Sequence, residues 1–268
     1  MCRLFGVAAT APVDISFELL DAPNPLIAQA QRHDSGWGIA SYRNGVPEVE
    51  RFALGAGTDP GFRHAARAVA DLAMVHVRRA TMGGMGPANT HPFDRDRFTY
   101  CHNGTILHPR ELIELADRRP RGETDSEHFF NVLMTVMDPD DVVRSLRRTV
   151  ELVSKRCRFS ALNLLFCDGR RLYAYRLGVY EMFWLEREID GNHSVLVSSE
   201  ELTHDEAWDE LEQDELLVCD PADPGHPRVQ RLLGPGADAI EFEPFDRLDH
   251  LSGAARGQWA ARRAEAGA

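Results

Sequence analysis

The sequence predicts an α+β domain in which two antiparallel β-sheets lie between helices. Short alternating apolar segments occur before residue 104 and again after residue 159, whereas the segment between them has apolar residues at helical spacing. Antiparallel strands on both sides of a helical block are typical of two sheets with helices outside them. With 268 residues, 43% hydrophobic and 27% charged, the chain fits one large domain or at most two.

In the first part of the chain, a buried strand is followed by a hairpin, a helix and another strand. The predicted strands are 2–9, 36–42, 47–53 and 74–78, and the predicted helix is 60–72. The hairpin prediction rests on Asn44-Gly45 between the second and third of these strands, because this dipeptide adopts the turn that matches the strand twist.

The middle of the chain carries a glycine-rich loop and the helical block. Residues 82–89 hold three glycines and a proline, so we expect a mobile loop that could act as a lid. A strand at 98–102 then ends in Asn103-Gly104, which is a turn signal. The remaining predicted elements are helices at 109–118, 125–137 and 140–155 and strands at 161–167, 172–176, 181–185, 194–198 and 216–219.

We expect one domain over residues 2–250 and a charged, Ala/Arg-rich tail over 251–268. No run of 18 apolar residues is present, which argues against a membrane span. The 42 acidic and 30 basic residues give a net charge of −12, which argues against nucleic-acid and anionic-membrane partners. Lys155 is the single lysine and follows no glycine-rich phosphate loop, so neither P-loop nor Schiff-base chemistry is expected.

The cysteine and histidine patterns argue against disulfides and metals. Five cysteines without a C-x-x-C pair predict neither a disulfide framework nor a structural zinc site, and a reducing cytoplasm is the expected location. The histidines show no metal-ligand spacing, so no metal and no cofactor are expected. We expect the cysteines other than Cys2 to be core residues: Cys101, Cys157, Cys167 and Cys219.

Cys2 can supply a nucleophile and a base together once Met1 is removed. Removal is expected when a small side chain follows, and it leaves a thiol and a free α-amine on one residue. The α-amine has a pKa of about 7.7–8.0 and the thiol about 8.5, so the neutral amine can accept the thiol proton near pH 7. The alternative is that Cys2 is a small hydrophobic residue that opens a buried strand.

A thiol that attacks an amide also needs hydrogen-bond donors for the oxyanion. Asn103 and Gly104 offer a side-chain amide and an unobstructed backbone N–H at the end of a strand. The same dipeptide is also common in ordinary turns, as at Asn44-Gly45.

Two charged residues could hold the two charges of an α-amino acid. If His76 and Arg78 share one strand face while the neighbouring valines pack inward, the Arg78 guanidinium can present a planar fork to a carboxylate. Asp125 lies in a Thr-x-x-Glu capping box that starts at Thr124, which explains it structurally, yet an acid there could also bind a substrate ammonium. Taken by itself, an arginine at this position is more often an ordinary surface arginine.

Five motifs together resemble the class II glutamine amidotransferases, which are N-terminal-nucleophile hydrolases. In the same order as in that family, they are residues 1–2 (MC), 76–81 (HVRRAT), 89–93 (NTHPF), 102–104 (HNG) and 122–127 (GETDSE). The resemblance covers about residues 2–220 and is closest to stand-alone, single-domain members.

The resemblance implies a four-layer αββα sandwich and a role for six residues. These are Cys2 as nucleophile, Asn103 and Gly104 as oxyanion hole, Arg78 and Thr81 as the anchor of the substrate α-carboxylate, and Asp125 as the anchor of its α-ammonium. Two departures stand out: Met82-Gly83 replaces the His-Gly of one branch, and Ser35 stands before Gly36-Trp37-Gly38 where relatives often have Asp, with the acid moved to Asp34.

The implied function is that of a glutamine amidotransferase-type amidohydrolase, which releases ammonia and glutamate through a γ-glutamyl thioester. The first alternative is hydrolysis of a γ-glutamyl bond in a glutathione-like peptide or thiol conjugate, and the second is an inactive regulatory subunit. About 50 residues after position 220 are too few for a synthase domain. Either a separate synthase or hydrolase subunit is the partner, or the chain is simply a hydrolase.

Overall fold

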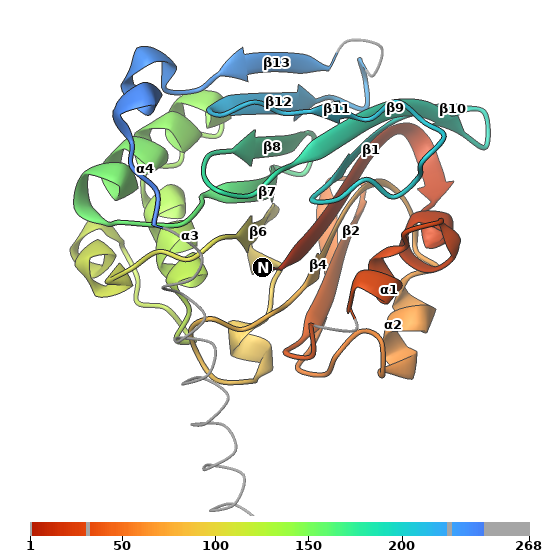
Figure 1. Cartoon of the computed structure of the whole chain (residues 1–268), viewed down its shortest axis with the longest axis horizontal. Coiled ribbons are helices and arrows are strands. Elements are labelled where there is room, and N and C mark those ends of the chain that lie inside the picture. Colours follow the sequence, from red (N-terminus) through yellow and green to blue (C-terminus); the bar gives the residue numbers. More distant parts are fainter. Residues whose placement is uncertain (1, 31–32, 224–226, 244–268) are drawn as a thin grey trace, which may run out of the picture.

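Two antiparallel sheets packed face to face form the centre of the molecule, as the computed structural model of residues 2–30, 33–223 and 227–243 shows (Figure 1). The seven-stranded sheet has the order β11-β9-β10-β1-β4-β2-β3, and the six-stranded sheet has the order β13-β12-β8-β7-β6-β5. All neighbouring strands are antiparallel.

The strands come from both ends of the described chain. Those of the seven-stranded sheet are β1 (Arg3–Asp14), β2 (Trp37–Arg43), β3 (Val46–Phe52), β4 (Val69–Val77), β9 (Phe183–Ile189), β10 (Asn192–Ser198) and β11 (Asp209–Glu210). Those of the six-stranded sheet are β5 (Phe93–Arg95), β6 (Phe98–Asn103), β7 (Asn163–Cys167), β8 (Leu172–Arg176), β12 (Glu215–Cys219) and β13 (Arg228–Arg231).

Helices cover the outer face of each sheet, which gives the four layers that the sequence predicts. The helices are α1 (Leu26–Gln29), α2 (Pro60–Ala65), α3 (Asp125–Thr135) and α4 (Val142–Arg156), with a π-helical turn at Phe17–Asp21 and 3-10 turns at Pro87–Asn89, Pro109–Leu115 and Gly234–Ala239. The first two helices pack on the seven-stranded sheet, and α3 and α4 pack on the six-stranded sheet (Figure 1).

Strand β1 is the central strand of this arrangement because both of its faces are buried. Phe5 and Val7 pack toward the helices, whereas Leu4 and Ala8 pack between the sheets. Gly6 also lies between the sheets, where an added Cβ would come within 3.0 Å of Leu172. The absence of a side chain at this position therefore allows the two sheets to approach closely.

The hairpin prediction is confirmed, because Asn44 and Gly45 join β2 to β3 with φ of 54° and 76°. Both values lie in the left-handed region that two-residue hairpin turns require. The predicted helix at 60–72 is too long: α2 ends at Ala65, and Val69 already pairs with Asp14 of β1.

Three short strands were not predicted, and one predicted helix has a different geometry. Strands β5, β11 and β13 contain only two to four residues, so alternation cannot reveal them. The predicted helix at 109–118 is a 3-10 turn that ends at Leu115. The predicted tail at 251–268 lies outside the described residues.

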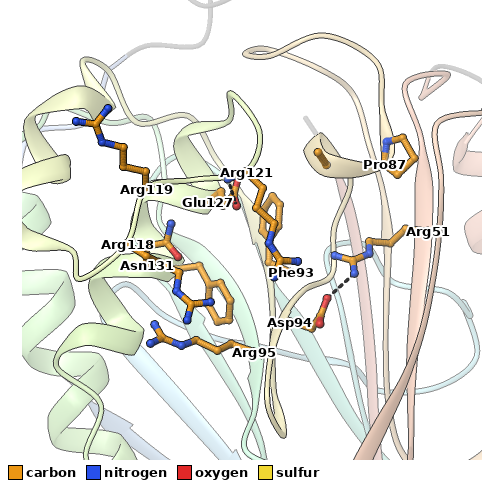
Figure 2. A pocket seen from close by; sticks show the side chains of 12 residues that line it. Arg51, Pro87, Phe93, Asp94, Arg95, Arg118, Arg119, Arg121, Glu127 and Asn131 are labelled. Atoms are coloured by element: carbon orange, nitrogen blue, oxygen red, sulfur yellow. Dashed lines mark hydrogen bonds and ion pairs between the residues drawn. The ribbon is translucent and has the colours of Figure 1, made fainter.

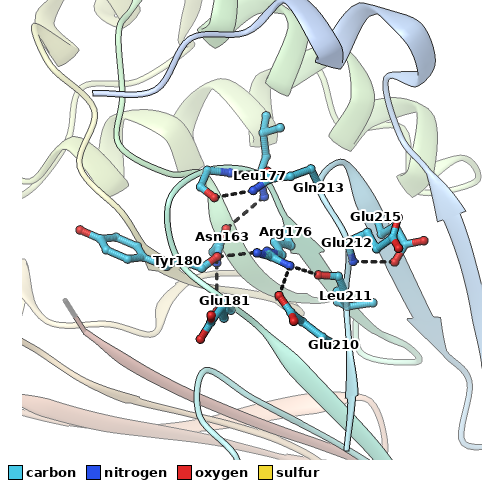
Figure 3. A network of polar contacts seen from close by, with 11 residues as sticks. Asn163, Arg176, Leu177, Tyr180, Glu181, Glu210, Leu211, Glu212, Gln213 and Glu215 are labelled. Atoms are coloured by element: carbon cyan, nitrogen blue, oxygen red, sulfur yellow. Dashed lines mark hydrogen bonds and ion pairs between the residues drawn. The ribbon is translucent and has the colours of Figure 1, made fainter. Parts of the chain in front are cut away.

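Polar side-chain contacts link the two sheets at two places. Arg51 of β3 pairs with Asp94 of β5 and donates to Pro92 O at 3.0 Å (Figure 2). At the other end, Arg176 of β8 reaches Glu210 of β11 at 2.5 Å (Figure 3). Side-chain contacts therefore link strands that share no backbone ladder.

The network in Figure 3 also fixes the loop beside the end of β6. Asn163 is the register partner of Asn103, and its amide donates to Tyr180 O and accepts from Leu177 N, both at 3.0 Å. Arg176 donates to the same Tyr180 O at 3.2 Å. The strand next to Asn103 is thus held by buried hydrogen bonds on its far side.

Candidate active site

Three strand ends bring predicted catalytic and substrate-binding residues together. Cys2 precedes β1, Asn103 ends β6, and Arg78 follows β4. Because Arg3 of β1 pairs with Val77 of β4, Cys2 lies beside the residues that follow β4. Its Sγ receives a hydrogen bond from Arg79 N at 3.4 Å and lies 3.5 Å from Arg79 O.

The surroundings of Cys2 favour the protonated form of its thiol. Burial raises the pKa of the Cys2 thiol, Asp125 acts in the same direction, and the Arg79 N–H and the Arg78 charge oppose them. The thiol is therefore protonated at neutral pH. A nearby proton acceptor is required before the sulfur can act as a nucleophile.

Asn103 contacts Cys2 directly and carries an unused donor. Cys2 N donates to Asn103 Oδ1 at 3.0 Å. This contact fixes the amide orientation, so the NH₂ group of Asn103 points elsewhere. Asn103 is fully buried, and its Nδ2 has no hydrogen-bond partner among the residues that the structure describes. An unsatisfied buried donor is unusual, and an oxygen atom that carries negative charge would satisfy it.

Gly104 follows in a position that no other residue can occupy without movement. An added Cβ would lie 2.0 Å from Ala161 O and 2.7 Å from His102 Nε2. His102 is itself held between Ala161 O at 3.1 Å and the Ser126 hydroxyl at 2.9 Å. The close packing of this turn therefore explains the glycine, in addition to any role of its N–H.

Arg78 is buried, and its guanidinium is held by the loop at 82–84. Nη2 donates to Met82 O at 2.7 Å and Nη1 to Gly84 O at 3.1 Å, with longer contacts of 3.4 Å to Gly83 O and Ser35 O. His76 is also fully buried. His76 and Arg78 therefore do not form an exposed strand face opposite the neighbouring valines. A carboxylate that binds both Nη atoms must displace some of these carbonyls.

Ser35 supports the segment that carries Arg78 and was not predicted to do so. Its hydroxyl accepts from Ala80 N at 3.2 Å, and its backbone N–H donates to Arg78 O at 3.2 Å. Asp34 lies next to it and accepts from the Ser35 hydroxyl at 3.3 Å. Nothing in the local sequence pattern signals this contact, because it joins residues 45 positions apart.

Asp125 starts α3, as the capping-box prediction requires. Thr124 is the N-cap and accepts from Glu127 N at 3.2 Å. Asp125 is buried and accepts from Ile106 N at 2.7 Å. Burial raises the pKa of the Asp125 carboxyl, although His102 and the Ile106 N–H act in the opposite direction.

Thr81 is held by the turn that follows Asn103. The Thr105 hydroxyl donates to Thr81 Oγ1 at 3.1 Å. Residues 103–106 therefore contact Cys2 through Asn103, Thr81 through Thr105 and Asp125 through Ile106. This one turn brings five of the six predicted site residues into one neighbourhood, and the contact between Cys2 and residue 79 brings Arg78 close to them.

Asn89 bridges the two loops around the site. Its Oδ1 accepts from Glu123 N at 2.7 Å, and its Nδ2 donates to Gly84 O at 3.0 Å, the same oxygen that Arg78 contacts. Glu127 does not complete the capping box at Thr124 N; instead its carboxylate accepts from the N–H groups of Arg121 and Gly122 at 2.6 and 2.7 Å. The sequence motif contains Asn89, but its bridging role was not predicted.

Two other histidines of the motifs are buried and neutral. His76 and His91 stack with ring centroids 4.1 Å apart. Burial lowers the pKa of His76 to about 3 and that of His91 well below its ordinary value. Neither ring carries a positive charge near pH 7, so neither supplies an imidazolium to the site.

All five cysteines are free thiols, and the four predicted to be core residues are buried. Burial raises the pKa of Cys157 to about 11 and that of Cys167 to about 12. Cys2 is half-buried. In the described part of the chain, no three His, Cys, Asp or Glu side chains form a group that could hold a metal ion.

A comparison with protein families matches residues 1–189 to the glutamine amidotransferases class-II. The chain belongs to the class II glutamine amidotransferase family. The match covers more than half of the chain and includes all six residues for which the sequence predicts a role.

Curated relatives of this class II glutamine amidotransferase family member differ in length. YafJ of Escherichia coli is 27% identical over 250 residues, covering 79% of this chain and 94% of YafJ. The uncharacterized protein MJ1515 of Methanocaldococcus jannaschii is 29% identical over 199 residues, covering 70% of this chain and 55% of that protein. The amidophosphoribosyltransferase of Pasteurella multocida is 25% identical over 234 residues, covering 80% and 44%. The chain thus spans nearly all of YafJ and about half of the other two.

Solved structures confirm the predicted N-terminal-nucleophile hydrolase fold. A glutamine aminotransferase class-II domain protein from Silicibacter pomeroyi has a TM-score of 0.63 at 21% identity, covering 86% of this chain and 99% of that chain. Glutamine phosphoribosylpyrophosphate amidotransferase from Bacillus subtilis also has a TM-score of 0.63, at 15% identity, covering 86% and 49%. At these identities the likeness concerns the fold alone. Among the helices described here, none is long and apolar enough to cross a membrane.

Proposed function

We propose that this chain hydrolyses the side-chain amide of glutamine with Cys2 as an N-terminal nucleophile. After removal of Met1, Cys2 N becomes an α-amine that accepts the thiol proton. The sulfur then attacks the amide carbonyl carbon, the proton passes to the leaving nitrogen, and ammonia departs to leave a γ-glutamyl thioester. Water hydrolyses the thioester, which releases glutamate and restores the thiol.

The observation that carries this proposal is the hydrogen bond between Cys2 N and Asn103 Oδ1. It holds the future α-amine in a fixed position and turns the unsatisfied Nδ2 of Asn103 away from it. This single contact would therefore position the proposed base, nucleophile and oxyanion donor. Together with the Gly104 N–H, Asn103 Nδ2 would stabilise the oxyanion of the tetrahedral intermediate.

Charged anchors in the same neighbourhood support an α-amino acid as substrate. Asp125 offers a buried carboxylate for the α-ammonium, and Arg78 with Thr81 offers donors for the α-carboxylate. Because the loop carbonyls hold Arg78, we propose that the loop at 82–89 shifts when the carboxylate binds. This assigns to the loop the lid role that the sequence predicts.

A second candidate is hydrolysis of a γ-glutamyl bond in a peptide or thiol conjugate. A pocket of about 850 Å³ opens beside Thr81 and Gly83 and is lined further by His108, Glu123 and His128. It offers room for a leaving group larger than ammonia next to the proposed anchors. The anchors for the glutamyl part would be the same in both reactions.

Glutamate release from glutamine and from glutathione distinguishes these candidates. The protein is first examined by intact-mass analysis, which we expect to show the loss of Met1. We expect Cys2→Ala to abolish turnover while the far-ultraviolet circular dichroism stays that of the wild type, because this small change costs only about 1 kcal/mol of stability. The mechanism would be refuted by full activity of a protein that retains Met1, or by full activity of Cys2→Ala. If a glutamine-analogue electrophile is not trapped on Cys2, the alternative of an inactive regulatory subunit is favoured.

If the reaction is a transfer, the ammonia that it releases needs an acceptor. We propose that a separate synthase chain then receives the ammonia. The free cysteines support a reducing compartment such as the cytoplasm.

A further inference from the structure

A second pocket, of about 270 Å³, has five arginines among the twelve residues that line it. It lies between β5, α3 and the segments at 87–88 and 118–121 (Figure 2). The arginines around it are Arg51, Arg95, Arg118, Arg119 and Arg121. In Figure 2 the Arg51 and Arg121 side chains approach Phe93 from two sides, whereas Arg119 points away. This positive site belongs to a chain with a net charge of −12.

Among the four of these arginines other than Arg119, two form no ion pair within the described residues. Arg118 and Arg121 make no side-chain hydrogen bond or ion pair with any residue in 2–30, 33–223 or 227–243. Arg51 is paired with Asp94, and Arg95 contacts both carboxylate oxygens of Asp117, the shorter contact being 2.7 Å. Arg118 and Arg121 are exposed to solvent, so their guanidinium groups are accessible to an anion that enters the pocket.

The carboxylates that line the pocket form no ion pair with Arg118 or Arg121. The Glu127 oxygens accept from the backbone N–H groups of Arg121 and Gly122, so Glu127 is directed to the backbone and not to the guanidinium groups. Asp94 is committed to Arg51. The positive charges of Arg118 and Arg121 therefore remain available to a ligand.

Asn131 provides an independent observation. It lines the same pocket from α3 and is 5% exposed. Its Nδ2 is buried and has no hydrogen-bond partner within the described residues. A buried amide donor without an acceptor is costly, and an acceptor oxygen of a bound ligand would satisfy it.

We propose that this pocket binds the phosphate group of a small phosphate monoester. Arg118 and Arg121 match the charge of nearly −2 that a phosphate monoester carries at pH 7, whereas a carboxylate carries half as much. Guanidinium groups bind phosphate oxygens through two hydrogen bonds each. Phe93 and Phe130 offer an apolar surface to the organic part, and the volume is near the lower end for small-molecule sites.

The pocket lies directly behind the loops of the candidate active site but does not depend on the proposed reaction. Pro87 and Ala88, which line it, precede Asn89, the bridge between Gly84 and Glu123. Arg121 precedes Gly122 on the opposite wall. Binding can therefore be measured in the intact chain whether or not glutamine is hydrolysed.

Isothermal titration calorimetry of the full chain at 0.15 M salt tests the site. The probes are inorganic phosphate, glycerol 3-phosphate and ribose 5-phosphate, with glycerol and ribose as unphosphorylated controls. We expect an ester to bind with a Kd below about 1 mM and free phosphate to bind more weakly. The double variant Arg118→Gln/Arg121→Gln removes two positive charges, and the single variant Asn131→Asp removes an amide donor. Each should weaken ester binding at least about tenfold, which corresponds to about 1.4 kcal/mol.

Arg148→Gln on α4 is the matched control, since Arg148 is an exposed arginine outside the pocket. It should leave the Kd unchanged, and circular dichroism should show all variants folded. The proposal would be overturned if no phosphate probe binds at about 10 mM, a concentration that detects binding free energies down to about 3 kcal/mol. Equal weakening of binding by Arg148→Gln would also overturn it. Equal affinity for inorganic phosphate and both esters would overturn the ester assignment in favour of orthophosphate.

Discussion

Cys2 N donates to Asn103 Oδ1 at 3.0 Å, and this contact leaves the buried Nδ2 of Asn103 unpaired. The two residues are 101 positions apart in the chain and meet because β1 begins beside the point where β6 ends. The Asn103 amide thus contacts the nitrogen of the proposed base through Oδ1, and its Nδ2 is the proposed oxyanion donor.

Asn103→Asp separates these two functions. The carboxylate keeps an acceptor for Cys2 N but removes the NH₂ donor, so the transition state loses one hydrogen bond while the geometry around Cys2 is retained. We expect kcat for glutamate release from glutamine to fall by about 10²–10³. Asn192→Asp, at the start of β10 far from this turn in the chain, should keep wild-type kcat. A wild-type kcat in Asn103→Asp would exclude an oxyanion role for its amide.

Arg78→Lys tests the proposed carboxylate anchor. The guanidinium spans Met82 O and Gly84 O through two nitrogens, which a single ammonium group cannot do. We expect KM for glutamine to rise by about 10–100-fold with a smaller change in kcat, because a two-point contact with the ground-state substrate is lost. The exposed Arg67, replaced by Lys, serves as a control and should leave KM unchanged. An unaltered KM in Arg78→Lys would contradict the anchor.

The sequence predicted those parts of the fold that local chemistry determines. Asn44-Gly45 requires left-handed backbone conformations and therefore marks its hairpin without reference to the rest of the chain. Val69 was assigned to a helix because its neighbours have helical spacing, yet pairing with Asp14 of β1 places it in β4. Strand β13 is exposed at all four positions, so no alternation could reveal it.

The same distinction holds for the candidate site. Position in the chain and residue type are enough to suggest a chemical role for Cys2 and for Asn103. These roles stay predictions. The contacts of Ser35, Asn89 and Thr105 join residues 45, 34 and 24 positions apart, and only the folded arrangement of the loops reveals them. The engagement of Arg78 by loop carbonyls is likewise a tertiary contact that no local pattern contains.

Asp125→Asn should stabilise the protein while it impairs substrate binding. Burial raises the pKa of the Asp125 carboxyl, so folding disfavours its ionised form. The native state therefore loses stability as the pH rises from the unfolded pKa through the folded pKa, and the Asn variant lacks this loss. We expect urea denaturation to show a more stable variant at pH 7, with a difference that disappears below the ordinary Asp pKa. Its kcat/KM for glutamine should fall about 10-fold or more.

Asp117→Asn provides a control of opposite sign. A hydrogen bond from Arg95 lowers the pKa of Asp117 to about 2, so its ionised form is favoured in the native state. This variant should be less stable than the wild type at pH 7, and the difference should shrink as the pH falls toward about 2. If both variants shift stability in the same direction at pH 7, the burial argument for Asp125 fails.

Gly122→Ala tests whether the bridge between the two loops supports the site. An added Cβ at residue 122 would lie 2.2 Å from Asn89 Oδ1 and 2.6 Å from Ala88 O, so Asn89 would have to leave Glu123 N and the loop at 82–84 would lose its support. We expect a loss of about 1–3 kcal/mol in the free energy of unfolding, as for other overpacked sites, together with a higher KM for glutamine.

Gly86→Ala is the matched control because it makes the same change in the adjoining loop. No atom lies within 4 Å of a Cβ built at residue 86, and its φ of 172° is extended backbone that any residue adopts. Its stability, measured by urea denaturation, and its KM should therefore stay close to the wild-type values. If both alanine variants raise KM equally, loop composition and not the Asn89 bridge controls substrate binding. If only Gly122→Ala does so, the contact from Asn89 to Gly84 O is what keeps the Arg78 loop in place.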